Sequence, residues 1–171
     1  MAENCQVLAM KIPGEGPRGL IRAARPQEAA QLSDLARRSK AHWGYAPEFM
    51  ASCREELTIE PDDVDAGLTF VMEADGTVLG FYAVKQVAHD RMELGFLFVE
   101  PAAIGRGYGR ALIEHAKCCV RTRGCRILEI QGDPHTAAFY RAAAGRLVGE
   151  RPSASITGRM LPLFEIDLST T

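Results

Sequence analysis

The fold is decided by the stretch from Met92 to Val120, which reads MELGFLFVEPAAIGRGYGRALIEHAKCCV. Its first part, Met92–Val99, is rich in aromatic and branched residues and predicts a strand that ends before Pro101. Glycines then occupy every second position from Gly105 to Gly109. After them, apolar residues recur at the three- and four-residue spacing of a helix with one buried face. We therefore predict a strand, a glycine loop and a helix in succession.

This succession is suited to binding a phosphate. Glycines let the backbone approach a ligand closely and adopt positive φ, and the first turn of a helix presents unpaired N–H groups at its positive end. Arg106 and Arg110 add guanidinium donors whose geometry matches phosphate oxygens. A dinucleotide-binding fold has a similar loop, followed about 20 residues later by an acidic residue, and Glu129 lies at about that distance in this chain. The position of the loop past the middle of a short chain argues against that fold.

Two segments resemble the motifs of the GNAT superfamily, the acyl-CoA-dependent N-acyltransferases. Val99–Pro101 followed by Gly105–Gly109 resembles motif A of the superfamily. Asp133–Tyr140 resembles motif B, a short helix that ends in Phe-Tyr. The resemblance covers roughly residues 19–169, nearly the whole chain.

The sequence departs from the superfamily pattern at three places. Ile104 stands where Gln or Arg usually opens the glycine loop, and Asp133 stands where Asn usually opens motif B. Ala144-Gly145 replaces the usual Gly-Phe. Because Ile104 cannot donate to a phosphate, we expect Arg106 and Arg110 to contribute more to phosphate binding.

The resemblance implies an acetyl-CoA site in a V-shaped gap between the motif A and motif B strands. The pantetheine amides would pair with the strand, and the pyrophosphate would bind the glycine loop. A backbone N–H near Phe98 or Val99 would stabilise the oxyanion that develops on the thioester carbonyl. The expected cofactor-binding residues are Leu97, Phe98, Val99, Ile104, Gly105, Arg106, Gly107, Tyr108, Gly109, Arg110, Asp133, Phe139 and Tyr140.

Tyr140 is our candidate for the general acid. Attack of an amine on acetyl-CoA expels a thiolate, and a phenol with a pKa of about 10 can reprotonate it while staying neutral at neutral pH. The alternative is a tyrosine that packs on the sheet with its hydroxyl bound to a backbone carbonyl.

Glu93 is our candidate for the base that deprotonates the amine. By two-residue alternation, and before any bulge, its side chain shares a face with Gly95, Leu97 and Val99. The alternative for Glu93 is a solvated or ion-paired strand residue. Glu129 is the reserve candidate, because a carboxylate in an apolar strand should have a raised pKa. His89 and His115 are weaker candidates.

The segment between the first two predicted helices lines the acceptor side in the superfamily. In this chain that segment contains His42, Trp43 and Tyr45, and the two large aromatic rings could hold an alkyl amine or a cation. Trp43 could equally fill the core between the helices. With Glu129, these three residues are the expected substrate-binding residues.

Length and composition exclude several classes of protein. The 171 residues are enough for one domain, and 47% hydrophobic with 25% charged residues is typical of a globular chain. A net charge of −2 without a basic run gives no reason to expect nucleic acid or a membrane as partner. Five cysteines without a CxxC pair are interpreted as reduced thiols of a cytoplasmic protein rather than metal ligands.

The order of the predicted elements along the chain indicates one domain. Residues 1–18 show no sustained periodicity and are interpreted as a flexible leader, and residues 19–171 as the GNAT-type domain. We predict an α/β (α+β) fold with a mixed, mostly antiparallel sheet of about six to seven strands and helices on both faces.

Three local features are predicted within that domain. Asp75-Gly76 indicates a hairpin between strands over residues 68–73 and 77–84. A second helix is predicted from Pro47 through Leu57, and a loop over residues 61–65. The last strand is predicted over Leu161–Leu168.

Together these features predict an acetyl-CoA-dependent N-acetyltransferase that transfers the acetyl group directly to a primary amine of a small molecule. One alternative is a non-catalytic sensor or interaction module that binds CoA, and another is an N-acetyltransferase of peptides or proteins. The last strand, Leu161–Leu168, could take part in a homodimer interface.

Overall fold

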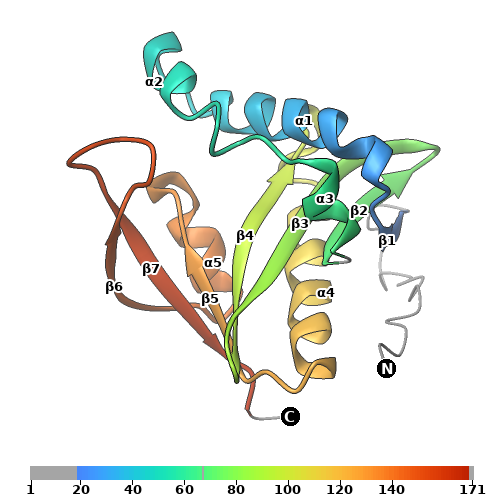
Figure 1. Ribbon diagram of the computed structural model, residues 1–171, viewed down its shortest axis with the longest axis vertical. Helices are drawn as coiled ribbons and strands as arrows, with labels where there is room; N and C mark the ends of the chain where they lie inside the picture. Colours follow the sequence, from blue (N-terminus) through green and yellow to red (C-terminus); the bar gives the residue numbers. More distant parts are fainter. Residues whose placement is uncertain (1–18, 67, 170–171) are drawn as a thin grey trace.

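Figure 1 shows the computed structural model, which describes residues 19–66 and 68–169. The predicted leader, residues 1–18, lies outside the described residues. Within the described ranges, no helix combines the length and apolar character needed to cross a bilayer. The strands are β1 (Leu20–Ala23), β2 (Thr69–Ala74), β3 (Thr77–Ala88), β4 (Arg91–Val99), β5 (Ile127–Gln131), β6 (Arg146–Pro152) and β7 (Met160–Asp167). The α-helices are α1 (Ala29–Ala41), α2 (Pro47–Ser52), α3 (Pro61–Asp65), α4 (Tyr108–Thr122) and α5 (Ala137–Ala142).

The strands form one sheet in the order β1-β2-β3-β4-β5-β7-β6. β4 and β5 run parallel, joined by α4 as the crossover, and every other described pair is antiparallel. This confirms the predicted mixed, mostly antiparallel sheet. Because β7 lies between β5 and β6, the free edge at this end of the sheet belongs to β6.

Helices cover both faces of the sheet, as predicted (Figure 1). α4 and α5 pack on one face, where Leu112, Ala116 and Tyr140 join a large buried cluster. α1 and the segment after α2 pack on the other face, around Leu32 and Phe81. We call these the α4 face and the α1 face.

The predicted hairpin forms between β2 and β3. Asp75 and Gly76 adopt φ of 49° and 75°, the two positive values that a type I′ turn requires. β3 continues to Ala88, four residues beyond the predicted end at Val84.

Two predictions on the segment between α1 and β2 were wrong. α2 ends at Ser52, and residues 53–57 form turns rather than the expected continuation of the helix. Residues 61–65, predicted as a loop, form α3. Pro61 begins this helix, and the side chains of Glu60 and Asp63 cap its N-terminus reciprocally.

β4 and β5 diverge midway along β4. Their pairing ends at Leu94 opposite Ile130, although β4 runs on to Val99. At the same level, the register between β3 and β4 shifts, because Ala83 faces Phe96 while Val84 faces Leu94. The residue without a partner is Gly95, which forms a β-bulge.

The bulge overturns the predicted orientation of Glu93. Before Gly95, the even-numbered Leu94 packs in the cluster of the α4 face. Beyond Gly95, the odd-numbered Leu97 packs in this cluster, and the even-numbered Phe96 packs on the α1 face. Side-chain alternation is thus reversed at the bulge. Glu93 therefore lies on the α1 face. Our prediction that it shares a face with Leu97 and Val99 was wrong.

Candidate active site

A cavity of about 430 Å³ opens where β4 and β5 diverge. Leu94–Val99 form one wall, and Gln131 and the segment that follows β5 form the other. The lining includes Leu97 from the α4 face and Phe96 from the α1 face, so the cavity extends from one face of the sheet to the other. This agrees with the V-shaped gap that the resemblance to the superfamily implies.

The glycine loop and the start of α4 border the cavity. Gly105 and Gly107 adopt φ of 80° and 91°, a region that favours glycine, and α4 begins at the next residue, Tyr108. A Cβ at Gly109 would lie 3.3 Å from the Phe139 ring, so a glycine here lets α4 start close to α5. The loop thus presents backbone N–H groups at the positive end of a helix of fifteen residues.

Most of the expected cofactor-binding residues meet at this cavity. All of them except Arg106 and Tyr108 are part of its lining. The Tyr108 side chain is buried in the core, and Arg106 is exposed beside its ring, at 6.0 Å from the ring centre. Arg110, also exposed, is the arginine of the loop that lines the cavity. The residues present therefore fit an extended thioester that carries a diphosphate.

The backbone of β4 offers donors to the cavity. Glu100, just after β4, donates its N–H to the carbonyl of Leu79 in β3, at 2.8 Å. Because N–H groups of alternate residues point the same way along a strand, the N–H groups of Leu97 and Val99 point away from β3 and toward the gap. The expected oxyanion donor is thus Val99, whereas the N–H of Phe98 faces β3.

Tyr140 is buried in the wall of the cavity. Its ring packs edge-on against Phe139 at 5.1 Å and near Phe164 at 5.9 Å. Burial, with the nearby charge of Asp133 as a smaller cause, raises the pKa of the Tyr140 phenol. No hydrogen bond to its hydroxyl is present among residues 19–66 and 68–169, in contrast to the alternative of a hydroxyl bound to a carbonyl.

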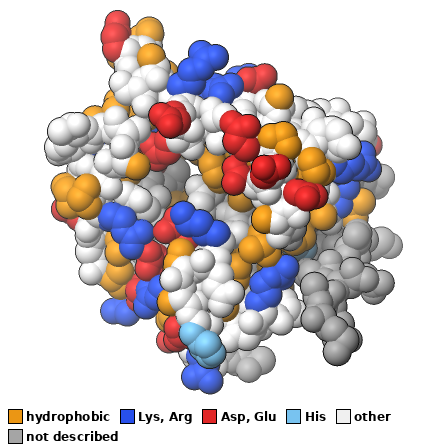
Figure 2. Space-filling view, in the orientation of Figure 1, with side chains coloured by type: hydrophobic (Ala, Val, Ile, Leu, Met, Phe, Trp, Pro, Cys, Tyr) orange, Lys and Arg blue, Asp and Glu red, His pale blue; other side chains and the backbone are white. Residues whose placement is uncertain are grey.

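Glu93 and Glu129 lie opposite each other on β4 and β5 and do not line the cavity. Arg151 of β6 binds both carboxylates and lies 3.3 Å from Glu93. Lys85 is 3.2 Å from Glu93, and Arg91 is 3.1 Å from Glu129. In the view of Figure 2, acidic and basic side chains are intermixed at the lower left of the molecule. Both glutamates are thus ion-paired in this structure.

Asp133 is the centre of a polar cluster at the mouth of the cavity. Its carboxylate accepts hydrogen bonds from the Tyr45 hydroxyl at 2.7 Å and from the His135 N–H at 3.0 Å. Lys40 and Arg159 lie 3.4 and 3.5 Å from it. Burial opposes ionisation of Asp133, but these donors and cations together lower its pKa below the usual value.

Tyr45 belongs to the same cluster, and its pKa is shifted there. Burial, followed by its hydrogen bond to Asp133, raises the pKa of Tyr45 to about 12, against the opposing effect of Arg159. Tyr45 was expected to contact the substrate, but it does not line the cavity and instead holds Asp133.

Trp43 lines the cavity and does not fill the core between helices. It is 38% exposed and stacks on His135 with the ring centres 5.3 Å apart. His42 lies edge-on to Trp43 at 5.4 Å and is not part of the lining. The stack connects the segment after α1 to the start of motif B.

Several lining residues were not predicted from the sequence. Among them are Lys40, Glu56, Gln131 and His135. His135 lies within the predicted motif B, although it was not singled out there. The other three match no local pattern that would have found them, because the place of each at the cavity depends on contacts between distant parts of the chain.

The chain is similar to a known protein family and to named N-acetyltransferases. Residues 31–145 match the model of the Acetyltransferase (GNAT) family. The 5-NmdU N-acetyltransferase of Pseudomonas phage PaMx11 is 27% identical over 147 residues, which cover 85% of this chain and 97% of that protein. The aminoglycoside N(6')-acetyltransferase type 1 of Stenotrophomonas maltophilia is 30% identical over 152 residues, with 84% and 93% covered.

A similar fold is found among solved structures. The PaiA N-acetyltransferase from Thermoplasma acidophilum, crystallised with coenzyme A, matches with a TM-score of 0.71 and 20% identity. The match covers 86% of this chain and 97% of that one. At this level of identity, the likeness shows a shared fold.

Proposed function

The chain belongs to the GNAT family of acetyltransferases and is an N-acetyltransferase that uses acetyl-CoA, and from this premise we propose that it acetylates a primary amine of a small molecule by direct transfer. The observation that carries the proposal is the cavity between β4 and β5. It reaches from the glycine loop and Tyr140 to the α1 face. A donor and an acceptor could therefore enter from opposite faces of the sheet and meet beside β4.

The glycine loop and β4 are proposed to hold the cofactor. The N–H groups at the start of α4, with Arg110, would bind the diphosphate. The open edge of β4 from Gly95 to Val99 would pair with the amides of the pantetheine arm. When bound, acetyl-CoA supplies an acetyl thioester whose sulfur is the leaving group. The Val99 N–H would then donate to the thioester carbonyl oxygen.

Tyr140 is proposed as the general acid. Tyr140 lines the same cavity as the β4 backbone, and burial raises the pKa of its phenol, so the neutral hydroxyl has a proton to give to the leaving sulfur. Glu93 stays the proposed base. It lies on the α1 face, from which the amine would enter, and would accept the amine proton through water because it does not line the cavity. Glu129 remains the reserve.

A small acceptor is favoured over a peptide by the turn between β6 and β7. Ser155 in this turn donates a hydrogen bond to Glu56 and lies 3.5 Å from the Cys53 sulfur. These contacts join the turn to the segment after α2 beside the cavity. An extended peptide would have to displace them.

The experiment that tests the proposal is an amine screen with acetyl-CoA. Small amines of varied charge and shape, and a set of peptides, are incubated with the protein. Free thiol is measured for turnover, and the mass of each amine is measured for a gain of one acetyl group. We expect acetylated small amines. Thiol release without an acetylated product, or acetylated peptides alone, would contradict the proposal.

A second copy of the chain is the proposed protein partner. β6 is an edge strand, and Leu147 and Val148 on it, with Met160 at the start of β7, are large exposed apolar residues. Light scattering would detect the dimer, and Leu147→Lys should shift it toward monomer. The cytoplasmic location remains a prediction.

A further inference from the structure

Glu56 is a carboxylate at the cavity whose charge is not balanced by a cation. It lies in the turn after α2 and is part of the cavity lining. Its partner among the described residues is the Ser155 hydroxyl, which is neutral. No ion pair to Glu56 occurs within residues 19–66 and 68–169.

The other carboxylates near the cavity are already neutralised. Asp133, the second acidic residue of the lining, lies between Lys40 and Arg159. Glu93 and Glu129 bind Arg151 and have further basic partners. An incoming ammonium group would have to displace a cation to pair with any of these three. At Glu56 it would meet an unpaired negative charge.

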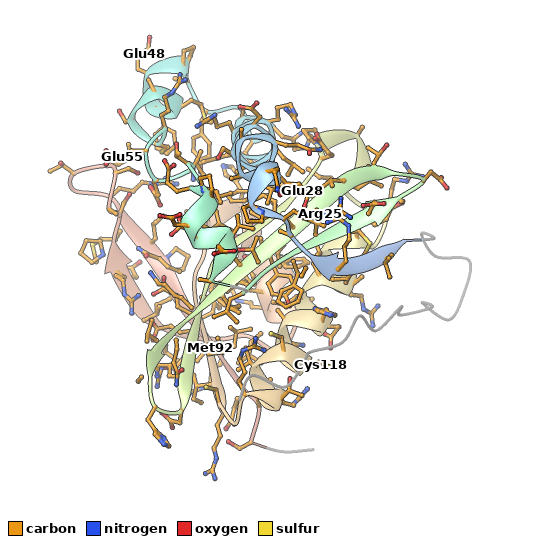
Figure 3. The ribbon with its side chains drawn as sticks, turned by 45° about the vertical axis from the view of Figure 1, so that its right-hand side comes forward. Arg25, Glu28, Glu48, Glu55, Met92 and Cys118 are labelled. Carbon is orange, nitrogen blue, oxygen red and sulfur yellow. The ribbon has the colours of Figure 1, made fainter. Side chains whose placement is uncertain are left out.

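Glu56 lies on the side of the sheet from which an acceptor would enter. Its neighbours Cys53 and Leu57 pack in the core of the α1 face, whereas Tyr140 belongs to the α4 face. In Figure 3, Glu55 of this segment is labelled at the upper left of the molecule, away from Cys118 on α4 at the lower right. A thioester beside β4 would thus lie between the Tyr140 hydroxyl and an ammonium held at Glu56.

The walls next to Glu56 indicate what kind of molecule would carry the amine. Leu57, Phe96, Phe98 and Leu161 line the cavity on or beside the α1 face and are apolar. Lys40 and Arg159 share the single negative charge of Asp133, so the positive charge left at Lys40, which lines the cavity, would repel a second positive charge on the acceptor. The surroundings therefore favour one ammonium group on an apolar body.

We propose that Glu56, supported by the Ser155 hydroxyl, binds the ammonium group of the acceptor, and that the acceptor is a primary amine with a single positive charge and an apolar body. This inference rests on the proposed acetyltransferase function and adds the substrate class and the residue that selects it. Glu56 is a binding residue, so its loss should raise the KM for the amine more than it lowers kcat.

The test compares Glu56→Gln with Glu55→Gln at saturating acetyl-CoA. Both changes remove one exposed carboxylate from the same turn, but Glu55 is not part of the cavity lining. The substrates are hexylamine and 1,6-diaminohexane, which differ in one cationic group. Glu56→Gln should raise the KM for hexylamine about tenfold, the effect of losing a charge-assisted hydrogen bond, with kcat within about threefold of the wild type. Glu55→Gln should leave both constants near the wild-type values.

Each outcome decides between the inference and its failure. An unchanged KM in Glu56→Gln, or an equal rise in Glu55→Gln, would overturn the role of Glu56. A lower KM for the diamine than for hexylamine would overturn the substrate class. If the wild type turns over no amine at all, the proposed function itself fails and this inference fails with it. Ser155→Ala should raise the KM less than Glu56→Gln, and a larger rise would contradict the supporting role of Ser155.

Discussion

The Tyr45 hydroxyl lies 2.7 Å from the Asp133 carboxylate, although the two residues are 88 positions apart in the chain. This hydrogen bond joins the segment after α1 to the start of motif B, on the two sides of the cavity mouth. Asp133 also lies between Lys40 and Arg159. The carboxylate that replaces the superfamily's usual Asn thus has a structural reason, because it pairs with two cations that an amide would leave without an ionic partner.

We predict that Asp133→Asn destabilises the protein by about 1–3 kcal/mol at neutral pH, since the partly buried cations Lys40 and Arg159 lose their anionic partner. The pKa of Asp133 is lowered in the folded state, so its contribution is complete above the unfolded value of about 3.9 and is lost as the pH falls through the folded value. Urea unfolding of both proteins should therefore show a difference at about pH 7 that shrinks toward pH 3. Asp90→Asn, at an exposed turn residue, is the control and should change little at either pH. A difference for Asp133→Asn that does not depend on pH would contradict the role of its charge.

The glycine loop can be tested by a pair of equal backbone changes. Gly105 and Gly124 have φ of 80° and 75°, and neither has an atom that a Cβ would contact within 4 Å. An alanine at either position should cost about 1 kcal/mol of stability through the left-handed backbone alone. Gly105→Ala should also weaken CoA binding about tenfold or more, because the added carbon blocks the close approach of the diphosphate.

The measurement is the stabilisation of each variant by CoA. At a hundredfold excess over the dissociation constant, CoA should raise the free energy of unfolding of the wild type by about 2.7 kcal/mol. Gly124→Ala should keep this stabilisation and Gly105→Ala should lose much of it at the same CoA concentration. Equal stabilisation of both variants would argue against diphosphate binding at this loop.

Tyr140→Phe should lower kcat about a hundredfold and leave the CoA dissociation constant nearly unchanged, because only the proton donor is removed. The phenylalanine ring keeps the packing against Phe139 and Phe164. Steady-state rates and calorimetric CoA titration provide the two values. Tyr82→Phe, a buried tyrosine of β3 that does not line the cavity, is the matched control and should keep its rate. A Tyr140→Phe enzyme with wild-type kcat would exclude Tyr140 as the acid.

Glu93→Gln should lower kcat/KM for the amine about tenfold or more, because the base that accepts the amine proton is lost. Glu165→Gln is the control, since Glu165 binds Arg91 in the same set of ion pairs but lies on β7, two strands away from β4. Steady-state rates of both variants at neutral pH would check this prediction. Equal losses of kcat/KM in both variants would mean that breaking the ion pairs lowers the rate and that Glu93 is not the base.

Much of the fold could be predicted because its signals are local. The Asp75-Gly76 turn, the apolar spacing after Gly109 and the Asp133 cap each act within a few residues, and the structure has the hairpin, α4 and the motif B helix where the sequence predicts them. The glycine loop is also a local signal of this kind. Its φ values and its place before a helix follow from residue types that stand next to each other.

The amino-acid sequence by itself therefore determined the strand, the glycine loop and the helix, and with them the side of the site that is suited to the cofactor. Only the tertiary structure decided the acceptor side. The bulge at Gly95 arises from the register between β3 and β4, and it turns Glu93 to the α1 face. Glu56 and Ser155 meet across 99 positions of the chain. Local backbone preferences extend over a few residues, whereas contacts of this kind exist only after the sheet has set which distant segments lie together.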